Sequence, residues 1–187
     1  MVRVLAVIAA LVCVAPALAQ QKLPAGLDPQ NTVLLETKNG RVVIKLRSDL
    51  APKHAERIKT LIREKFYDNV PFHRVINGFM AQTGDGQNGN GTGGSKYPDL
   101  QAEFSKVPFK RGIVGMARKG GNNDSANSQF FIMLDEASSL NGQYTVIGEV
   151  VSGMDVVDKI KKGSELNNGA VTDPDRIVRI QVAADAK

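Results

Sequence analysis

One segment, FHRVINGFMAQTGD at 72–85, concentrates the side chains of this chain that could take part in chemistry. It contains Arg74 and Gln82 among aromatic and aliphatic residues, and Asn77-Gly78 divides it into two short runs of β type. An arginine provides a planar, permanently charged set of N–H donors, and a glutamine can both donate and accept. Such groups beside apolar side chains indicate a site that binds an apolar substrate and directs a few hydrogen bonds to it.

Strand alternation predicts which of these side chains lie together, because successive residues of a strand point to opposite faces. In the predicted strand 79–83, Met80 and Gln82 share one face. The predicted strand 129–134 has a mixed face, with Gln129, Phe131 and Met133, and a wholly apolar face, with Phe130, Ile132 and Leu134. The apolar set belongs to a core, whereas the two mixed sets predict an open groove. For either strand taken by itself, a surface strand with incidental apolar residues is the alternative.

The elements that position this cluster are predicted to be mostly short strands. Eight runs of β type are bounded by turn signals, at 32–37, 41–47, 70–76, 79–83, 113–118, 129–134, 145–151 and 176–182. The first two are linked by Asn39-Gly40, a strong hairpin signal. Because no internal repeat is present, this set predicts a mainly β chain whose single antiparallel sheet closes into a barrel.

Two helices complete the predicted domain. Pro52 opens the first, and the apolar residues after it recur at the three- and four-residue spacing of one buried face, at Ala55, Ile58, Leu61 and Ile62. The second helix is predicted at 154–161, where apolar residues again repeat at helical spacing, and Gly163 could end it.

The segment 84–110 is predicted to be a loop, because it is rich in Gly, Asn, Ser and Pro. Its start, GDGQNG at 84–89, matches a dinucleotide-binding pattern by letter. That motif requires a helix directly after the glycines, whose N-terminus meets the pyrophosphate. The sequence NGTGGSKYPD that follows, at 90–99, does not favour a helix. The glycines are better explained as residues that permit positive φ in a tightly wound loop.

Residues 1–19 predict a cleaved export signal. They combine an early positive charge, an apolar run at 4–14 and the small-residue site Ala-Leu-Ala at 17–19. Residues 20–30 predict a flexible tether, and 31–187 a single domain of ordinary size. We therefore expect a periplasmic protein with no stable membrane insertion after the signal is removed.

Composition argues against several classes of function. The formal net charge is +5, but lysines and arginines are scattered among acidic residues, so we expect no nucleic-acid partner. Cys13 is the only cysteine and lies in the predicted signal, so we expect no redox chemistry, no metal and no cofactor. The two histidines, His54 and His73, are interpreted as structural or surface residues, because no catalytic or metal-binding spacing accompanies them.

In its ordered motifs the chain resembles the cyclophilin family of peptidyl-prolyl cis-trans isomerases, above all the exported bacterial members. The resemblance runs from about 31 to 182 and rests on FHRVINGFMAQTGD, NGTGG at 90–94, GMAR at 115–118, SQFFI at 128–132 and LNGQYTVIGEV at 140–150. It implies a closed eight-stranded antiparallel β-barrel capped by two α-helices. It also implies an enzyme that rotates X-Pro bonds in proline-containing unfolded or flexible polypeptides, and we expect it to be a monomer.

The resemblance further implies roles for individual residues. Arg74 matches the family's catalytic arginine, and Gln82 the glutamine that orients it. The positions that match the proline-ring pocket are Phe79, Met80, Phe131 and Leu140, and those that match the peptide groove are Gly91, Ala117, Arg118 and Gln129. Tyr144 stands where many members carry histidine; its flat ring with a polar tip predicts an altered substrate preference and retained catalysis. The charged pair Arg118-Lys119 predicts a bias toward acidic peptides.

A second class of function stays open: a chaperone or adaptor that binds proline-containing segments without isomerising them. Such a binder has no need of a donor directed at the amide nitrogen, so the combination of Arg74, Gln82 and Phe131 favours the enzyme. A hydrolase is disfavoured, because the sequence offers no activated nucleophile.

Overall fold

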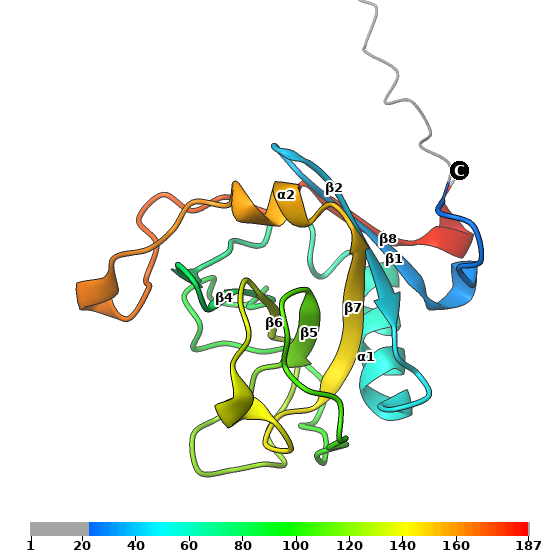
Figure 1. Ribbon diagram of the computed structural model, residues 1–187, viewed down its shortest axis with the longest axis horizontal. Helices are drawn as coiled ribbons and strands as arrows, with labels where there is room; N and C mark the ends of the chain where they lie inside the picture. The colour runs from blue at the N-terminus through cyan, green and yellow to red at the C-terminus, as the bar shows by residue number, and fades with distance from the viewer. Residues whose placement is uncertain (1–22, 187) are drawn as a thin grey trace, which may run out of the picture.

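The computed structural model describes residues 23–186 and is built around one antiparallel sheet in the order β3-β4-β6-β5-β7-β2-β1-β8 (Figure 1). The predicted export signal at 1–19 lies outside the described residues. The strands are β1 (Thr32–Thr37), β2 (Gly40–Leu46), β3 (Arg74–Ile76), β4 (Met80–Thr83), β5 (Ile113–Met116), β6 (Phe130–Met133), β7 (Val146–Ser152) and β8 (Arg179–Val182). Together with the helices α1 (Pro52–Arg63) and α2 (Met154–Asp158), they confirm the predicted mainly β fold of eight strands and two helices.

The sheet curls into a half-barrel, which differs from the continuous closed barrel that the sequence predicted. Its two end strands, β3 and β8, do not pair as a ladder within the described residues, and the chain segments before them pair at an isolated bridge between Pro71 and Arg176. Backbone hydrogen bonds flank this bridge, from Phe72 N to Asp175 O at 2.8 Å and from Ile177 N to Val70 O at 2.9 Å. After Phe72 the backbone pairs with the segment 163–171 instead of β8, since Val171 N donates to His73 O and Val75 N donates to Gly169 O. The predicted strands 70–76 and 176–182 are accordingly shorter in the structure, at Arg74–Ile76 and Arg179–Val182.

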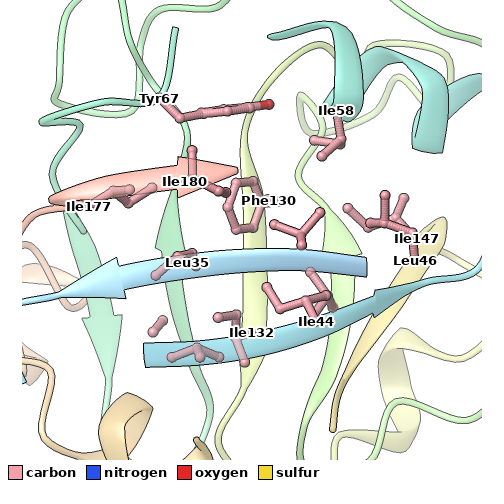
Figure 2. Close-up of a cluster of buried hydrophobic side chains, with 14 of the residues drawn as sticks. Leu35, Ile44, Leu46, Ile58, Tyr67, Phe130, Ile132, Ile147, Ile177 and Ile180 are labelled. Carbon is pink, nitrogen blue, oxygen red and sulfur yellow. The ribbon is translucent and has the colours of Figure 1, made fainter. Parts of the chain in front are cut away.

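The core fills the concave side of the curled sheet. Figure 2 shows side chains from several elements converging there, with Ile58 of α1 above Leu46 and Ile147 of β2 and β7. Ile132 of β6 is fully buried in this cluster, as alternation predicted. Tyr67 is also fully buried, and its hydroxyl donates to Ser128 O at 2.8 Å, which satisfies the one polar group of that side chain.

Both helices are anchored by carboxylates from elsewhere in the chain. At the start of α1, Glu103 of the long loop accepts hydrogen bonds from the backbone N–H of Lys53 and His54 and lies 2.6 Å from His54 Nδ1. It therefore caps a helix whose own preceding residue, Ala51, provides no side-chain cap. The helix α2 ends at Asp158, earlier than the predicted 154–161; the next two N–H groups donate to carbonyls three residues back, and that of Lys161 donates to the Asp175 carboxylate.

No helix within residues 23–186 combines the length and apolar content that crossing a bilayer requires.

Candidate active site

Strand pairing places the predicted central residues side by side. In the register of the sheet, Arg74 of β3 lies opposite Gln82 of β4, and Gln82 lies opposite Phe131 of β6. Residues opposite each other in an antiparallel sheet present their side chains on the same face. The three side chains on which the sequence analysis relied therefore form one row across three strands.

A chain of amide groups links this row to the long loop. Arg74 Nη1 donates to Gln82 Oε1 at 3.2 Å, and Gln82 Nε2 donates to Gln129 Oε1 at 2.9 Å. Gln129 Nε2 in turn donates to the carbonyls of Gly91 and Gly93, at 2.9 and 2.8 Å. Each amide is thus held in one orientation, since its oxygen accepts from one neighbour while its nitrogen donates to the next.

The other edge of the arginine meets a residue that the sequence analysis did not single out. Asn168 accepts from Arg74 Nε through its backbone carbonyl and from Nη2 through Oδ1, each at 3.0 Å. With the bond to Gln82, three of the five guanidinium N–H groups are occupied by described residues, and one N–H on each terminal nitrogen is left over. Burial lowers the pKa of Arg74 from its usual value, an effect that Tyr144 opposes. The group still carries its charge at any physiological pH.

A cavity of about 120 Å³, with apolar side chains on some walls and polar groups on others, opens beside the guanidinium. Most of the predicted site residues meet at its walls, namely Arg74, Phe79, Met80, Gln82, Ala117, Arg118, Phe131, Leu140 and Tyr144. A cavity of this size holds several water molecules, and its ring-lined walls favour a small apolar group over water.

Aromatic rings shape the floor and one wall of this cavity. Phe131 stacks on Phe109 with 5.8 Å between ring centroids, and Tyr144 meets Phe131 edge-on at 5.7 Å. The packing depends on Gly115, because a Cβ there would come within 2.6 Å of the Phe131 ring and 2.7 Å of the Phe109 ring. Phe109 was missed in the sequence analysis, since it lies in a segment read as loop.

A second, more polar cavity of about 380 Å³ adjoins the first and contains the two remaining predicted residues, Gly91 and Gln129. Arg118 lines both cavities. Its guanidinium carbon lies 4.6 Å from the centre of the Tyr144 ring, and its Nε donates to Gln143 O at 3.1 Å. Arg118 therefore marks the boundary between the two cavities with a fixed positive charge.

The loop that borders the polar cavity is organised by one buried carboxylate. Asp85 accepts backbone hydrogen bonds from several residues of this loop, including Asn88 and Gly91 at 2.8 Å and Gly93 at 3.0 Å. Burial on its own would raise the pKa of Asp85, but these N–H donors outweigh it and lower the pKa to about 2. The glycines of GDGQNG thus belong to a wound loop around a carboxylate, and no helix follows them.

Residues 23–186 contain no group of three or more His, Cys, Asp or Glu side chains that could hold a metal ion. His73 lies beside Gly91, where a Cβ would come within 3.0 Å of its ring. Burial lowers the pKa of His73, with Asp85 acting in the opposite direction. It does not line the cavity that contains Arg74.

Comparison with known proteins identifies the same family that the sequence motifs resemble. The family model described as "Cyclophilin type peptidyl-prolyl cis-trans isomerase/CLD" matches residues 32–182. A Brucella suis protein described as "Probable peptidyl-prolyl cis-trans isomerase" is 58% identical over 190 residues, covering 96% of each chain. An Encephalitozoon cuniculi peptidyl-prolyl cis-trans isomerase is 44% identical over 139 residues, covering 70% of this chain and 78% of its own.

Solved structures agree with the fold. A cyclophilin from Hirschia baltica superimposes with a TM-score of 0.76 at 27% identity, covering 86% of this chain and 77% of its own. A Cryptosporidium parvum cyclophilin-type isomerase, crystallised in the presence of the dipeptide Ala-Pro, gives a TM-score of 0.73 at 26% identity, covering 81% of this chain and 98% of its own. From its motifs, its half-barrel and these relatives, the chain belongs to the cyclophilin-type peptidyl-prolyl cis-trans isomerase family.

Proposed function

We propose that Arg74 is the catalytic residue of this isomerase and acts on the nitrogen of the rotating X-Pro bond. The observation that carries the proposal is a guanidinium with one uncommitted N–H on each terminal nitrogen, held at the wall of a cavity that Phe131 and Tyr144 also line. The cavity receives the pyrrolidine ring, which brings the imide bond to the arginine. The Cryptosporidium parvum relative crystallised with Ala-Pro supports a proline-containing ligand for this family member as well.

The reaction explains why a donor is useful at this place. Rotation about an X-Pro bond crosses a barrier of about 18–20 kcal/mol, because twisting the bond breaks amide resonance. At the half-turned geometry the prolyl nitrogen becomes pyramidal, and its lone pair can accept a hydrogen bond that neither ground state accepts. A bond that forms only in the transition state raises turnover without tightening ground-state binding.

The arginine cannot supply the whole effect. An acceleration of roughly 10⁵-fold corresponds to about 7 kcal/mol of barrier lowering, whereas one positioned donor in a dry site contributes about 3–4 kcal/mol. The remainder comes from exclusion of water by the aromatic cavity and from a fixed grip on the peptide. In the proposed complex the ring lies against Phe79, Met80, Phe131, Leu140 and Tyr144, and the peptide follows Gly91, Ala117, Arg118 and Gln129.

We further propose that the clients are exported polypeptides in unfolded or flexible states and that the protein acts in the periplasm as a monomer. The predicted signal at 1–19 supports export. Neither nucleic acid nor a cofactor is part of this proposal.

The discriminating variant for catalysis is Arg74→Lys, which keeps the charge but loses the planar fork of donors. We expect kcat/KM for a short proline peptide to fall by about 10²-fold or more, because lysine cannot bond Gln82, Asn168 and the prolyl nitrogen together. A protease-coupled isomerisation assay measures this directly. Near-normal turnover by the variant would refute the role given to Arg74.

The rival function, a proline-binding chaperone or adaptor, makes a different prediction for the wild-type protein. A pure binder slows or shields proline-limited refolding in proportion to its concentration, whereas an isomerase accelerates it at substoichiometric amounts. The two functions can therefore be separated by following the refolding of a client that has a slow proline phase. This protein is added at one tenth of the client's molar concentration.

A further inference from the structure

Arg74 is hydrogen-bonded to a segment that lies far from it in the sequence. Between α2 and β8 the chain leaves the sheet in a long excursion, which is the orange projection at the left of Figure 1 and includes a 3-10 turn at Glu165–Asn167. Asn168 follows this turn, 94 positions along the chain from Arg74. The excursion then returns along the free edge of β3.

Backbone hydrogen bonds fasten both legs of the excursion to β3. Val75 donates to Gly169 O at 2.8 Å, Gly163 donates to Val75 O at 2.9 Å, and Val171 donates to His73 O at 3.1 Å. The returning leg thereby behaves like a short additional strand at the edge of the sheet. Its position relative to the backbone of Arg74 is therefore set by main-chain contacts, and Val171 of this leg also packs against the main core.

Two glycines make this close approach possible. Gly169 has a φ of +78°, and a Cβ there would lie 2.4 Å from Ile76 Cγ1. A Cβ on Gly163 would lie 1.9 Å from Gly169 O. Asn168 itself has a φ of 50°, in the left-handed region that asparagine tolerates better than most residues. The local backbone thus turns the carbonyl and the side-chain oxygen of one residue toward the same guanidinium.

Gln82 could not fix the guanidinium without this second partner. A single hydrogen bond of 3.2 Å to Nη1 leaves the group free to rotate about that contact. The two 3.0 Å bonds from Asn168 occupy Nε and Nη2, which form the opposite edge of the planar fork. Contacts on both edges define the plane of the group, and with it the direction of the two uncommitted N–H groups.

We propose that Asn168 is a positioning residue for catalysis: it orients the guanidinium of Arg74 so that its uncommitted N–H groups meet the twisted imide. This inference rests on the proposed role of Arg74. It assigns Asn168 no contact with the substrate, and accordingly its loss lowers kcat and leaves KM nearly unchanged.

The test compares Asn168→Gly with Asn168→Asp. Glycine keeps the left-handed backbone and the carbonyl contact but removes the Oδ1 acceptor, whereas aspartate keeps an acceptor at that position. We expect kcat of Asn168→Gly to fall by about 5- to 10-fold, as for one lost charge-assisted hydrogen bond, and Asn168→Asp to stay within about twofold of wild type. Asn167→Gly is the matched control for added loop flexibility, because the neighbouring side chain makes no hydrogen bond within the described residues. It should leave kcat unchanged.

Repeating Asn168→Gly in an Arg74→Ala background decides how the residue acts. If Asn168 works through the arginine, its substitution has no further effect on kcat/KM once the guanidinium is gone. A persistent 5- to 10-fold effect in that background, or an unchanged kcat of Asn168→Gly in the wild-type background, would overturn the inference. Wild-type turnover by Arg74→Ala itself would instead sink the proposed function, so the two failures are distinguishable.

Discussion

The two faces of the strands β4 and β6 differ although they are built from alternating residues of the same backbone. The inner face contributes Ala81, Phe130 and Ile132 to the main core, which α1 covers from the other side. The outer face contributes Met80, Phe131 and Met133 to a smaller cluster that surrounds the cavity beside Arg74. The inner face of each strand is therefore packed in the core, whereas the outer face borders a cavity.

The two faces are held in place by different kinds of interaction. The inner face is held by aliphatic contacts, which stabilise roughly in proportion to the apolar area removed from water. The outer face is surrounded by loops, and these are held by directed hydrogen bonds such as those to Asp85 and from Gln129. Perturbing the inner face should therefore change stability, and perturbing the outer face should change activity.

The largest effect on stability is expected from Ile132→Ala on the inner face. Ile132 is fully buried, so the substitution leaves a cavity in the core, and we expect the free energy of unfolding to fall by about 3–4 kcal/mol. Urea denaturation measures this, with Ile132→Val, expected to lose about 1 kcal/mol, as the graded control. The kcat/KM of the folded fraction should remain within about twofold of wild type. A large loss of activity without loss of stability would break the distinction between the faces.

Low pH should reduce the free energy of unfolding through Asp85, which holds the loop beside the outer face. Its pKa is lowered to about 2 in the folded protein, below the ordinary value of an unfolded aspartate near 3.9. A depressed pKa contributes stability above the unfolded value, and that stability is lost as the pH falls from about 4 toward about 2. We expect a loss of about 2 kcal/mol over this window, measured by urea denaturation.

Asp85→Asn removes this titration, so the free energy of unfolding of the variant should depend less on pH below 4. At neutral pH the variant should be less stable than wild type, because its amide nitrogen would face N–H donors. The exposed Asp135→Asn serves as the control and should follow wild type. An Asp85→Asn variant with the acid profile of wild type would show that the carboxylate does not hold the loop.

The smallest effect concerns the charge at the boundary of the two cavities. Arg118 is fixed over Tyr144, whereas the neighbouring Lys119 is paired with Asp99 at 3.4 Å, so the bias toward acidic peptides should come mainly from Arg118. For peptides that differ in carrying glutamate or lysine two residues before the proline, Arg118→Ala should reduce the preference for glutamate by about 2- to 5-fold in kcat/KM at low salt. Lys119→Ala is the matched control. An equal effect from Lys119→Ala would reassign the preference.

Local patterns in the sequence predicted much of the difference between the two faces. Asn39-Gly40 predicted the β1–β2 hairpin almost to the residue, and alternation assigned Ile132 and Phe131 to opposite faces. These features depend on neighbouring residues and on a period of two, which the sequence displays directly. The resemblance to known motifs then indicated which side chains would gather around Arg74.

Features that depend on distant contacts were not predicted. Asn168 reaches Arg74 only because the excursion returns along β3, and Phe109 stacks on Phe131 of the cavity wall from a segment without strand character. The interrupted closure of the sheet depends on where Pro71 meets Arg176, which no local pattern indicates. Each of these contacts is set by tertiary pairing and is invisible to local propensity.

The most direct test of the central claim compares turnover with binding for Arg74→Ala on a single proline peptide. NMR exchange spectroscopy gives the rate of cis-trans interconversion on the enzyme, and a titration of the same sample gives Kd. We predict that the catalysed rate falls by about 10²-fold or more while Kd changes by less than about threefold, because the arginine acts on the twisted bond and not on either ground state. A catalysed rate close to wild type, or a loss of affinity as large as the loss of rate, would contradict this account.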